Sequence, residues 1–331
     1  MSKTVKTTLI VATVLIVVGV VISGIAFGKV GFDIRRFSNT EAPINHVYTS
    51  KPTANIQTIT VRGVSENYRI VQHSGTSIEV SYYEDAQTTY TIEEQGNTLL
   101  ITEKVTPGFF IFNFDFSMIN RETVISVPAS FTGSIDFIIS SGNVTIQGLS
   151  DCSGLKVSNS SGNINCVNVS VVNDLSISAI SGNIVCSDVS ASKNLSCTSR
   201  SGDIRCTRIS AGEISLLATS GNIICDGVDA TRDLLIETAS GDIRCSDMHA
   251  QSASLKATSG NITARRLSVS GLICRARSGD IVIDILGVEK TYRISARSLS
   301  GTVRVPSGNT QAANSIDLET TSGNIRLSFD S

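Results

Sequence analysis

The chain of 331 residues contains no tryptophan, only five prolines and only three histidines. The histidines, His46, His73 and His249, are too few and too scattered to suggest a metal site or a general base. The formal net charge of −2 gives no sign of nucleic-acid binding. Helix-favouring signals are also scarce, whereas Ser, Thr, Asn, Ile, Val and 26 glycines dominate. This composition predicts an all-β protein.

One long apolar run lies near the start of the chain, at residues 9–27, with basic residues on both sides. A helix over this run rises ~1.5 Å per residue and covers about 28 Å, enough to cross a bilayer core of roughly 30 Å. A cleaved signal peptide is the alternative, although the run is long for one. Because basic residues flank both ends of the run, the positive-inside rule hardly indicates which end of the helix is cytoplasmic. We predict a short tail at 1–8, a transmembrane helix or signal anchor at 9–27 and a linker at 28–43.

Most of the remaining chain is built from a repeat of about twenty residues. The motif Ser-Gly-Asn/Asp-Ile/Val recurs eight times, two looser copies follow, and successive motif glycines are 19 to 22 residues apart. A fixed period near twenty without a helical pattern is typical of a β-solenoid. The motif glycines are Gly142, Gly162, Gly182, Gly202, Gly221, Gly241, Gly260, Gly279, Gly301 and Gly323. We therefore predict a single-stranded β-solenoid of about ten coils over residues 129–331.

Apolar residues alternate on both sides of each motif glycine. Positions +2 and +4 carry aliphatic residues or cysteine, and positions −7 and −5 are apolar as well. This alternation of period two indicates two strands that meet at the glycine. Another apolar position recurs at +7, as in Val169, and closes a third side of the coil. Stacked coils would bury these side chains in one continuous core.

The motif glycines are predicted to be structural corners. Glycine tolerates the positive φ of a sharp bend, and the Asn or Asp that follows can bond its own turn. Asp203, Asp242 and Asp280 could also suggest calcium, but the Gly-Gly-x-Gly-x-Asp motif of calcium-binding coils is absent. We therefore favour corner hydrogen bonding over a metal role for these aspartates.

Five of the eight cysteines occupy position +4 of consecutive coils, and Cys197 and Cys274 share position −5. We interpret the five as a buried cysteine column that fills a narrow core position. Disulfide bonds between these cysteines remain an alternative, although side chains stacked in register point the same way rather than at each other. A soft-metal site is least favoured because Cys-x-x-Cys and Cys/His pairs are absent, so we predict no metal and no cofactor. The column consists of Cys166, Cys186, Cys206, Cys225 and Cys245.

Residues 107–119 read PGFFIFNFDFSMI and contain five of the eleven phenylalanines. As a loop, this segment would expose an apolar patch suited to contact with a membrane or a partner. The alternative, which we favour, is a strand or cap that plugs the amino-terminal end of the solenoid. The residues concerned are Phe109, Phe110, Phe112, Phe114 and Phe116.

Residues 44–128 contain strand-like runs separated by Gly, Asn and Ser, and we expect degenerate opening coils or a cap there. The apolar amino-terminal segment, Phe32-Asp33, the 56–61 strand, Val127-Pro128 and the repeated motif together resemble the bacterial putative-adhesin family with β-strand repeats, domain of unknown function 4097. The resemblance covers nearly everything after residue 30. It implies a cell-envelope protein, with some relatives in envelope-stress operons, and it supplies no catalytic residues.

The sequence also lacks a Gly-x-Ser-x-Gly motif, a phosphate loop and paired carboxylates, so we predict that the protein is not an enzyme. We predict a single-pass protein of the cell membrane whose extracytoplasmic β-solenoid acts as a non-catalytic surface binding or adhesin-like protein. An accessory or sensory protein of the envelope stress response is one alternative, and an inert structural spacer is another. The expected partners are the membrane, through the anchor, and another envelope or surface component.

Overall fold

The computed structural model describes residues 3–29, 43–51, 55–106 and 121–330. Helix α1 (Lys3–Lys29) covers the apolar run. Within the residues that are described, no helix is both long enough and apolar enough to cross a membrane. The membrane-spanning role of residues 9–27 therefore stays a prediction.

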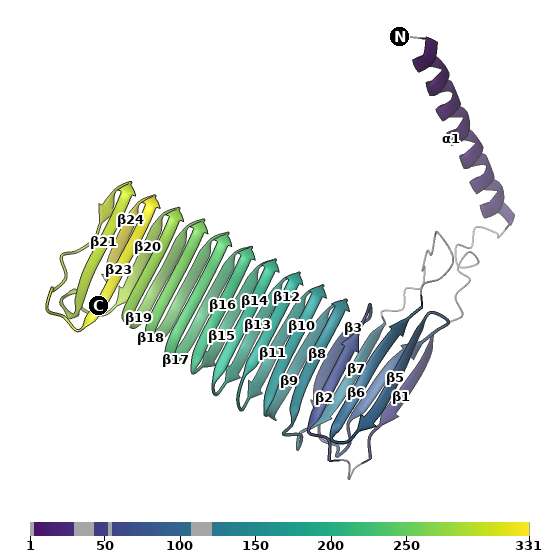
Figure 1. Cartoon of the computed structure of the whole chain (residues 1–331), viewed down its shortest axis with the longest axis horizontal. Helices are drawn as coiled ribbons and strands as arrows, with labels where there is room; N and C mark the ends of the chain where they lie inside the picture. Colours follow the sequence, from purple (N-terminus) through teal and green to yellow (C-terminus); the bar gives the residue numbers. More distant parts are fainter. Residues whose placement is uncertain (1–2, 30–42, 52–54, 107–120, 331) are drawn as a thin grey trace.

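The rest of the described chain forms one 24-stranded sheet that is wound into a solenoid (Figure 1). The predicted all-β solenoid of about ten coils is thus confirmed. The regular coils comprise β8 (Ser134–Ser141), β9 (Val144–Cys152), β10 (Gly154–Ser161), β11 (Ile164–Val171), β12 (Leu175–Ser181), β13 (Ile184–Ala191), β14 (Asn194–Ser201), β15 (Ile204–Ala211), β16 (Glu213–Ser220), β17 (Ile223–Ser240), β18 (Ile243–Ser259), β19 (Ile262–Ser278) and β20 (Ile281–Leu286).

Each strand pairs in parallel with the equivalent strand of the next coil, so like residues stack on like. Ile164 pairs with Ile184, and Ile184 pairs with Ile204. Because side chains alternate across a strand, every second residue of each strand enters the core. The buried apolar residues of all coils form one continuous cluster. A single coil could not bury this surface alone, and stacking therefore supplies the stability of the rod.

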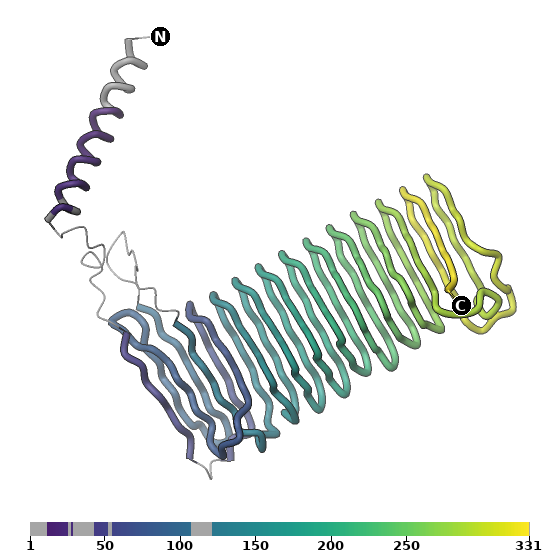
Figure 2. Tube along the Cα trace, turned by 180° about the vertical axis from the view of Figure 1, so that it is seen from behind, coloured from purple at the N-terminus to yellow at the C-terminus, as the bar shows by residue number. Residues whose placement is uncertain are grey.

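At the carboxy-terminal end, the order of the coils in space differs from their order in the chain. The strands here are β21 (Tyr292–Ser300), β22 (Val303–Arg304), β23 (Asn314–Ser322) and β24 (Ile325–Asp330), and a short 3-10 helix, η2 (Glu289–Thr291), precedes them. Strand β23 lies between β19 and β21, and β24 lies between β20 and β22. The last coil of the chain (β23 and β24) thus lies between the coil of β19 and β20 and the coil of β21 and β22, as the yellow trace in Figure 2 shows.

The amino-terminal end has a similar inversion. It contains β1 (Ile44–Thr49), β2 (Thr58–Gly63), β3 (Asn67–His73), β4 (Glu79–Glu84), β5 (Thr88–Gln95), β6 (Thr98–Val105) and β7 (Glu122–Pro128). The coil of β2 and β3 lies between the coil of β8 and β9 and the coil of β6 and β7. Strands β4 and β5 then pair with β7 and β6 in antiparallel fashion, and β1 pairs with β4. This antiparallel addition, rather than further coils, ends the described solenoid.

A buried carboxylate holds this amino-terminal end together. Glu103 on β6 is only 2 % exposed, and it accepts hydrogen bonds from the main-chain N–H groups of Val64 (2.6 Å) and Ser65 (3.1 Å). The hydroxyl groups of Ser65 and Tyr68 donate to it as well, at 2.9 and 2.7 Å. Burial, followed by nearby Tyr90 and Glu103, raises the pKa of Tyr68, which therefore stays a hydrogen-bond donor. Glu103 thus joins β6 to the β2–β3 corner.

Candidate functional site

All ten motif glycines lie at bends with φ between 105° and 154°. This region of φ is unfavourable for residues with a Cβ atom. Stacking adds a second restriction, because a Cβ on Gly202 would lie 2.6 Å from the carbonyl carbon of Gly182 in the preceding coil. The corner positions therefore accommodate only glycine, and their role is structural.

The Asn or Asp side chain after each corner glycine bonds the next coil rather than its own turn, so the sequence-based interpretation was wrong in this detail. The N–H of Asn183 donates to Oδ1 of Asn163 at 2.9 Å, and the N–H of Asp203 donates to Oδ1 of Asn183 at 2.8 Å. Asp203 Oδ1 accepts in turn from the N–H of Asn222, and its second oxygen accepts from Arg205. An amide and a carboxylate both serve as acceptors here, which explains why either Asn or Asp can follow the corner glycine. Asp203 thus takes part in corner hydrogen bonding, as predicted, but with the next coil as the donor.

A second bend, which the sequence analysis did not identify, lies at position +6. Asn168, Asp188, Arg208, Asp247 and Arg266 adopt φ between 51° and 57° there. The side chains at this bend project from the rod, and Arg208 bonds Asp188 of the preceding coil at 2.5 and 2.6 Å. Exposed pairs of this kind add little stability. The position thus tolerates residues other than glycine.

All eight cysteines are buried and unpaired, and the predicted column lies in the core. Cys186 on β13 and Cys206 on β15 are register partners on one wall. Cys197 on β14 comes from the facing wall, and its Sγ lies 3.8 Å from Sγ of Cys186. The three sulfur atoms all lie within 4.8 Å of one another. Register along one column could not reveal this convergence, because it joins two different columns across the core.

The phenylalanine-rich segment lies outside the described residues. The proposed contact of Phe109, Phe110, Phe112, Phe114 and Phe116 with a membrane or partner, and the alternative of a plug, stay predictions.

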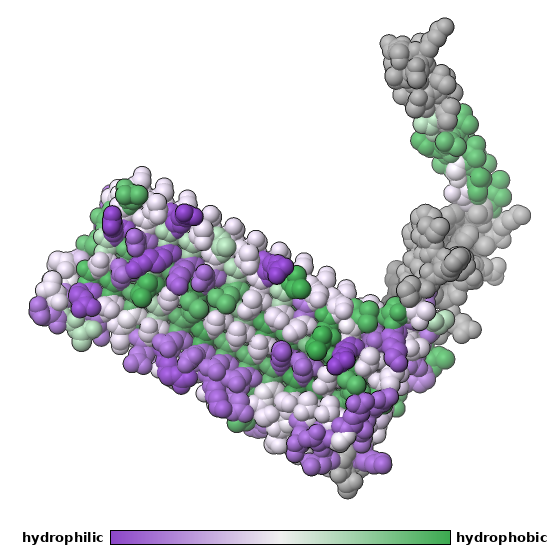
Figure 3. Space-filling view, in the orientation of Figure 1, coloured by the Kyte–Doolittle hydropathy of each residue, from purple (hydrophilic) through white to green (hydrophobic). Residues whose placement is uncertain are grey.

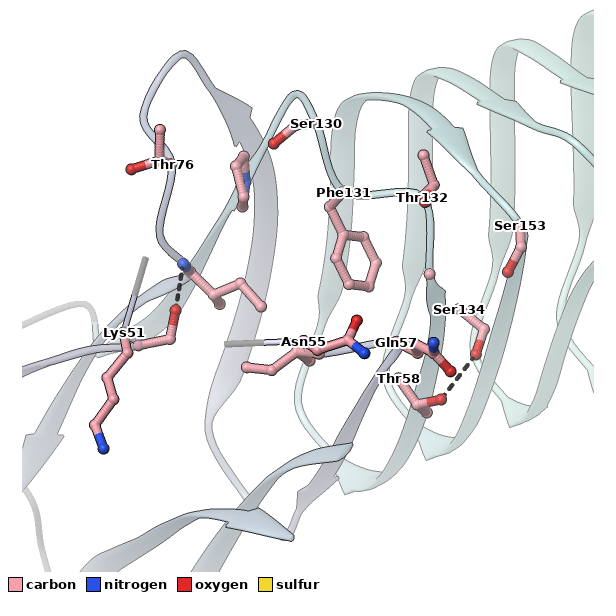
Figure 4. A pocket seen from close by; sticks show the side chains of 15 residues that line it. Lys51, Asn55, Gln57, Thr58, Thr76, Ser130, Phe131, Thr132, Ser134 and Ser153 are labelled. Carbon is pink, nitrogen blue, oxygen red and sulfur yellow. Dashed lines mark hydrogen bonds between the residues drawn. The ribbon is translucent and has the colours of Figure 1, made fainter. Parts of the chain in front are cut away.

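A polar pocket of about 610 Å³ lies beside the first coils, where the turn between β7 and β8 approaches the segment before β2 (Figure 4). The ring of Phe131 points into it toward Asn55 and Gln57, and the other lining groups are mostly hydroxyls. Lys51 is the one ionisable side chain among the residues that line this pocket. The pocket can thus donate hydrogen bonds to a polar ligand, but it holds no acid–base pair for catalysis.

The opposite end of the solenoid carries a group of arginines that we call the distal arginine edge: Arg293, Arg297, Arg304 and Arg326. Arg304 and Arg326 are register partners on β22 and β24. Both line two shallow hollows of about 330 and 520 Å³. All four side chains are exposed, and in the described part of the chain none of them forms an ion pair. Hydrophilic side chains also gather at this end on the face seen in Figure 3.

Arg304 and Arg326 differ from the arginines at the same position, +3, of other coils. Arg205 and Arg244 also occupy position +3, but each is paired with the aspartate of its own corner, at 2.8 and 2.6 Å. Adjacent guanidinium groups repel each other unless an anion lies between them. Arg304 and Arg326 are thus arranged to accept a carboxylate, sulfate or phosphate group.

The described chain is thus a stacked β-solenoid with a hydroxyl-lined pocket at one end and, at the other, arginines that form no ion pair among the described residues. The chain belongs to the toastrack DUF4097 family, whose model matches residues 56–191 and 170–328. This family has no known catalytic activity. None of the curated proteins matches the chain.

Solved structures that match the chain include two described as a "putative adhesin". One, from Bacteroides fragilis, is 14 % identical, with a TM-score of 0.36, and the match covers 88 % of this chain and 98 % of the other. The second, from Parabacteroides distasonis, is 13 % identical, with a TM-score of 0.47 and coverage of 87 % and 97 %. A "putative cell adhesion protein" from Clostridium sporogenes is 10 % identical, with a TM-score of 0.24 and coverage of 87 % and 100 %. These values carry no inference about activity.

Proposed function

We propose that the protein is a non-catalytic, adhesin-like surface protein that binds an anionic polymer through the distal arginine edge. The observation that carries this proposal is the in-register pair of Arg304 and Arg326 at the end of the rod farthest from β1. Among the described residues neither arginine forms an ion pair, although Asp280 and Glu289 line the same hollows. A polymer bearing carboxylate, sulfate or phosphate groups would offer several anions to the edge at once. Arg293 and Arg297 lie on the other wall of the same terminal coil, on β21.

Heparin immobilised on a sensor surface is a suitable polyanionic probe for the full-length chain. We expect the double variant Arg304→Gln, Arg326→Gln to bind about tenfold more weakly, because two ion pairs with the polymer are lost. Raising the salt concentration should weaken wild-type binding and reduce the difference between the two proteins.

The matched control is Arg205→Gln with Arg244→Gln, which removes the same charge from the same column, where the arginines are already paired. This control should keep wild-type affinity. Equal losses in the two double variants would indicate a response to net charge alone. Absence of heparin binding by the wild type would favour the inert spacer instead.

We further propose that residues 9–27 anchor the protein in the cell membrane and that the solenoid lies outside the cell. The apolar run and the helical conformation of α1 support this proposal. A double substitution Val17→Arg, Val18→Arg should release the chain from the membrane fraction into the soluble fraction after alkaline washing. Each arginine near the centre of a spanning helix costs about 2.5–3.5 kcal/mol of insertion free energy.

The control for anchoring is Val172→Arg, which places a charge at an exposed position of the solenoid, where Val172 is 51 % exposed. It should stay in the membrane fraction. Retention of the Val17, Val18 variant would contradict anchoring by this segment. External protease digestion of intact cells then tests on which side of the membrane the solenoid lies.

A further inference from the structure

Three thiol groups from two walls of the solenoid meet inside the core. Cys186 and Cys206 contribute from neighbouring coils of one wall, and Cys197 contributes from the facing wall. All three are at most 1 % exposed. No His, Asp or Glu belongs to this group among the described residues, so its ligand chemistry is that of sulfur alone.

We propose that Cys186, Cys197 and Cys206 form a binding site for a soft, thiophilic cation of low coordination number, of which Cu(I) is the representative. Thiolate sulfur selects soft ions such as Cu(I) over hard ones. A three-coordinate ion with metal–sulfur bonds of about 2.3 Å holds its sulfur atoms roughly 4 Å apart. The observed separation of 3.8 Å between Cys186 and Cys197 meets this requirement.

The site is less suited to Zn²⁺. Structural zinc is almost always bound by four ligands in a tetrahedron. Here three sulfur atoms lie within 4.8 Å of one another, and the surroundings are apolar core side chains and the cysteines of the adjacent coils, which are not part of this group. A dry, three-sulfur environment favours an ion that is stable with three ligands.

Further thiol groups flank the three sulfur atoms along the column. Cys166 is the register partner of Cys186, and Cys225 is the register partner of Cys206, in the adjacent coils. Binding of Cu(I) forms three copper–sulfur bonds, breaks three S–H bonds and releases three protons to water, and the copper stays in the +1 state.

The test uses the reduced, full-length chain in detergent, titrated without oxygen against a chromophoric Cu(I) chelator. We expect one tightly bound Cu(I) per chain and a sulfur-to-copper charge-transfer absorption. Cys197→Val should lower the affinity by at least about 100-fold, since it removes a direct ligand, while outer-shell changes alone cost 10- to 100-fold. Because all three sulfur atoms are buried, each protein is also refolded in the presence of Cu(I), so that slow entry does not mask binding.

The matched control is Cys274→Val. Cys274 is buried at the same position −5, but the +4 positions of its own coil and of the preceding coil carry Ile283 and Ala264 instead of cysteine. This variant should bind Cu(I) like the wild type. If Cys197→Val does not fold, Cys206→Ala replaces it, because the same column accommodates Ala264 in a later coil. Thermal unfolding of each protein without metal verifies that packing is retained.

Several results would overturn the proposal. Wild-type affinity in Cys197→Val, or an equal loss in Cys274→Val, would place Cu(I) elsewhere. Thiol counting on the protein as isolated that finds a Cys186–Cys197 disulfide would assign the pair to covalent cross-linking. Zn²⁺ binding as tight as that of Cu(I) would reject a site selective for soft ions. None of these results depends on heparin binding at the distal arginine edge.

Discussion

Replacement of Gly202 by valine should cost the protein at least about 3 kcal/mol of folding free energy and should split its unfolding into more than one step. The backbone at Gly202 has a φ of 146°, which a β-branched residue resists. A Cβ there would also lie 2.6 Å from the carbonyl carbon of Gly182, which belongs to the rigid column of stacked corners. Because each coil contacts only its neighbours, one disrupted corner uncouples the coils on either side. Circular dichroism during urea and thermal unfolding measures both effects.

The control is Gly148→Asn at the +6 bend. Gly148 also has a positive φ, 64°, but a Cβ there would meet no atom within 4 Å. Asn168 occupies the equivalent position in the next coil with a φ of 54°. This variant should unfold like the wild type. A Gly202→Val protein with unchanged unfolding would refute the corner requirement, whereas destabilisation of both variants by the same amount would point to a general sensitivity to glycine replacement.

Replacement of Glu103 by glutamine should destabilise the amino-terminal end by about 3 kcal/mol, although the two side chains have nearly the same shape. Three main-chain N–H groups, those of Val64, Ser65 and Glu66, and two hydroxyls point at the carboxylate of Glu103. A glutamine would direct its own NH₂ group at one set of donors and leave them unsatisfied in a buried position. Loss of hydrogen bonds to a buried charged group typically costs about 1.5–3 kcal/mol or more. Amide hydrogen exchange at Val64 and Ser65 should quicken.

Glu93→Gln is the matched control, because Glu93 lies on the neighbouring strand β5, is exposed and bonds only Gln95 among the described residues. We expect its free energy of unfolding to differ from that of the wild type by less than about 0.5 kcal/mol. If Glu103→Gln exchanged its amide hydrogens no faster than this control, Glu103 would not hold the β2–β3 corner.

The regular coils were predictable because their pattern is local and repeated. Each motif glycine marks a corner, and alternation on both sides of it identifies the inward residues, so that the spacing alone assigns Ile164, Ile184 and Ile204 to one column, as their pairing confirms. The acceptor role of Asn163 was only half predictable. Its residue type indicated a backbone hydrogen bond, but the donor belongs to another coil, and no local pattern identifies which one.

The ends of the solenoid were less predictable for the same physical reason. The copy at Gly323 follows the copy at Gly301 in the chain, yet it stacks directly on Gly279. The repeats specify that coils stack, but each coil presents nearly the same edges, so sequence order alone does not decide which coil is the neighbour. The long segment between β22 and β23 lets the chain pass back, and packing against β19 and β20 selects the inserted arrangement.

The candidate sites likewise divide into features that the sequence predicts and features that only the structure shows. From the sequence alone came the class of scaffold, the corner glycines, the membership of the cysteine column and the absence of a catalytic motif, because each depends on residues within one repeat. Only the tertiary structure brought Cys197 across the core to Cys186, set Arg304 beside Arg326 and buried Glu103 under the β2–β3 corner. These contacts join residues from different coils or facing walls, and their free energy depends on distances that no single period in the sequence determines.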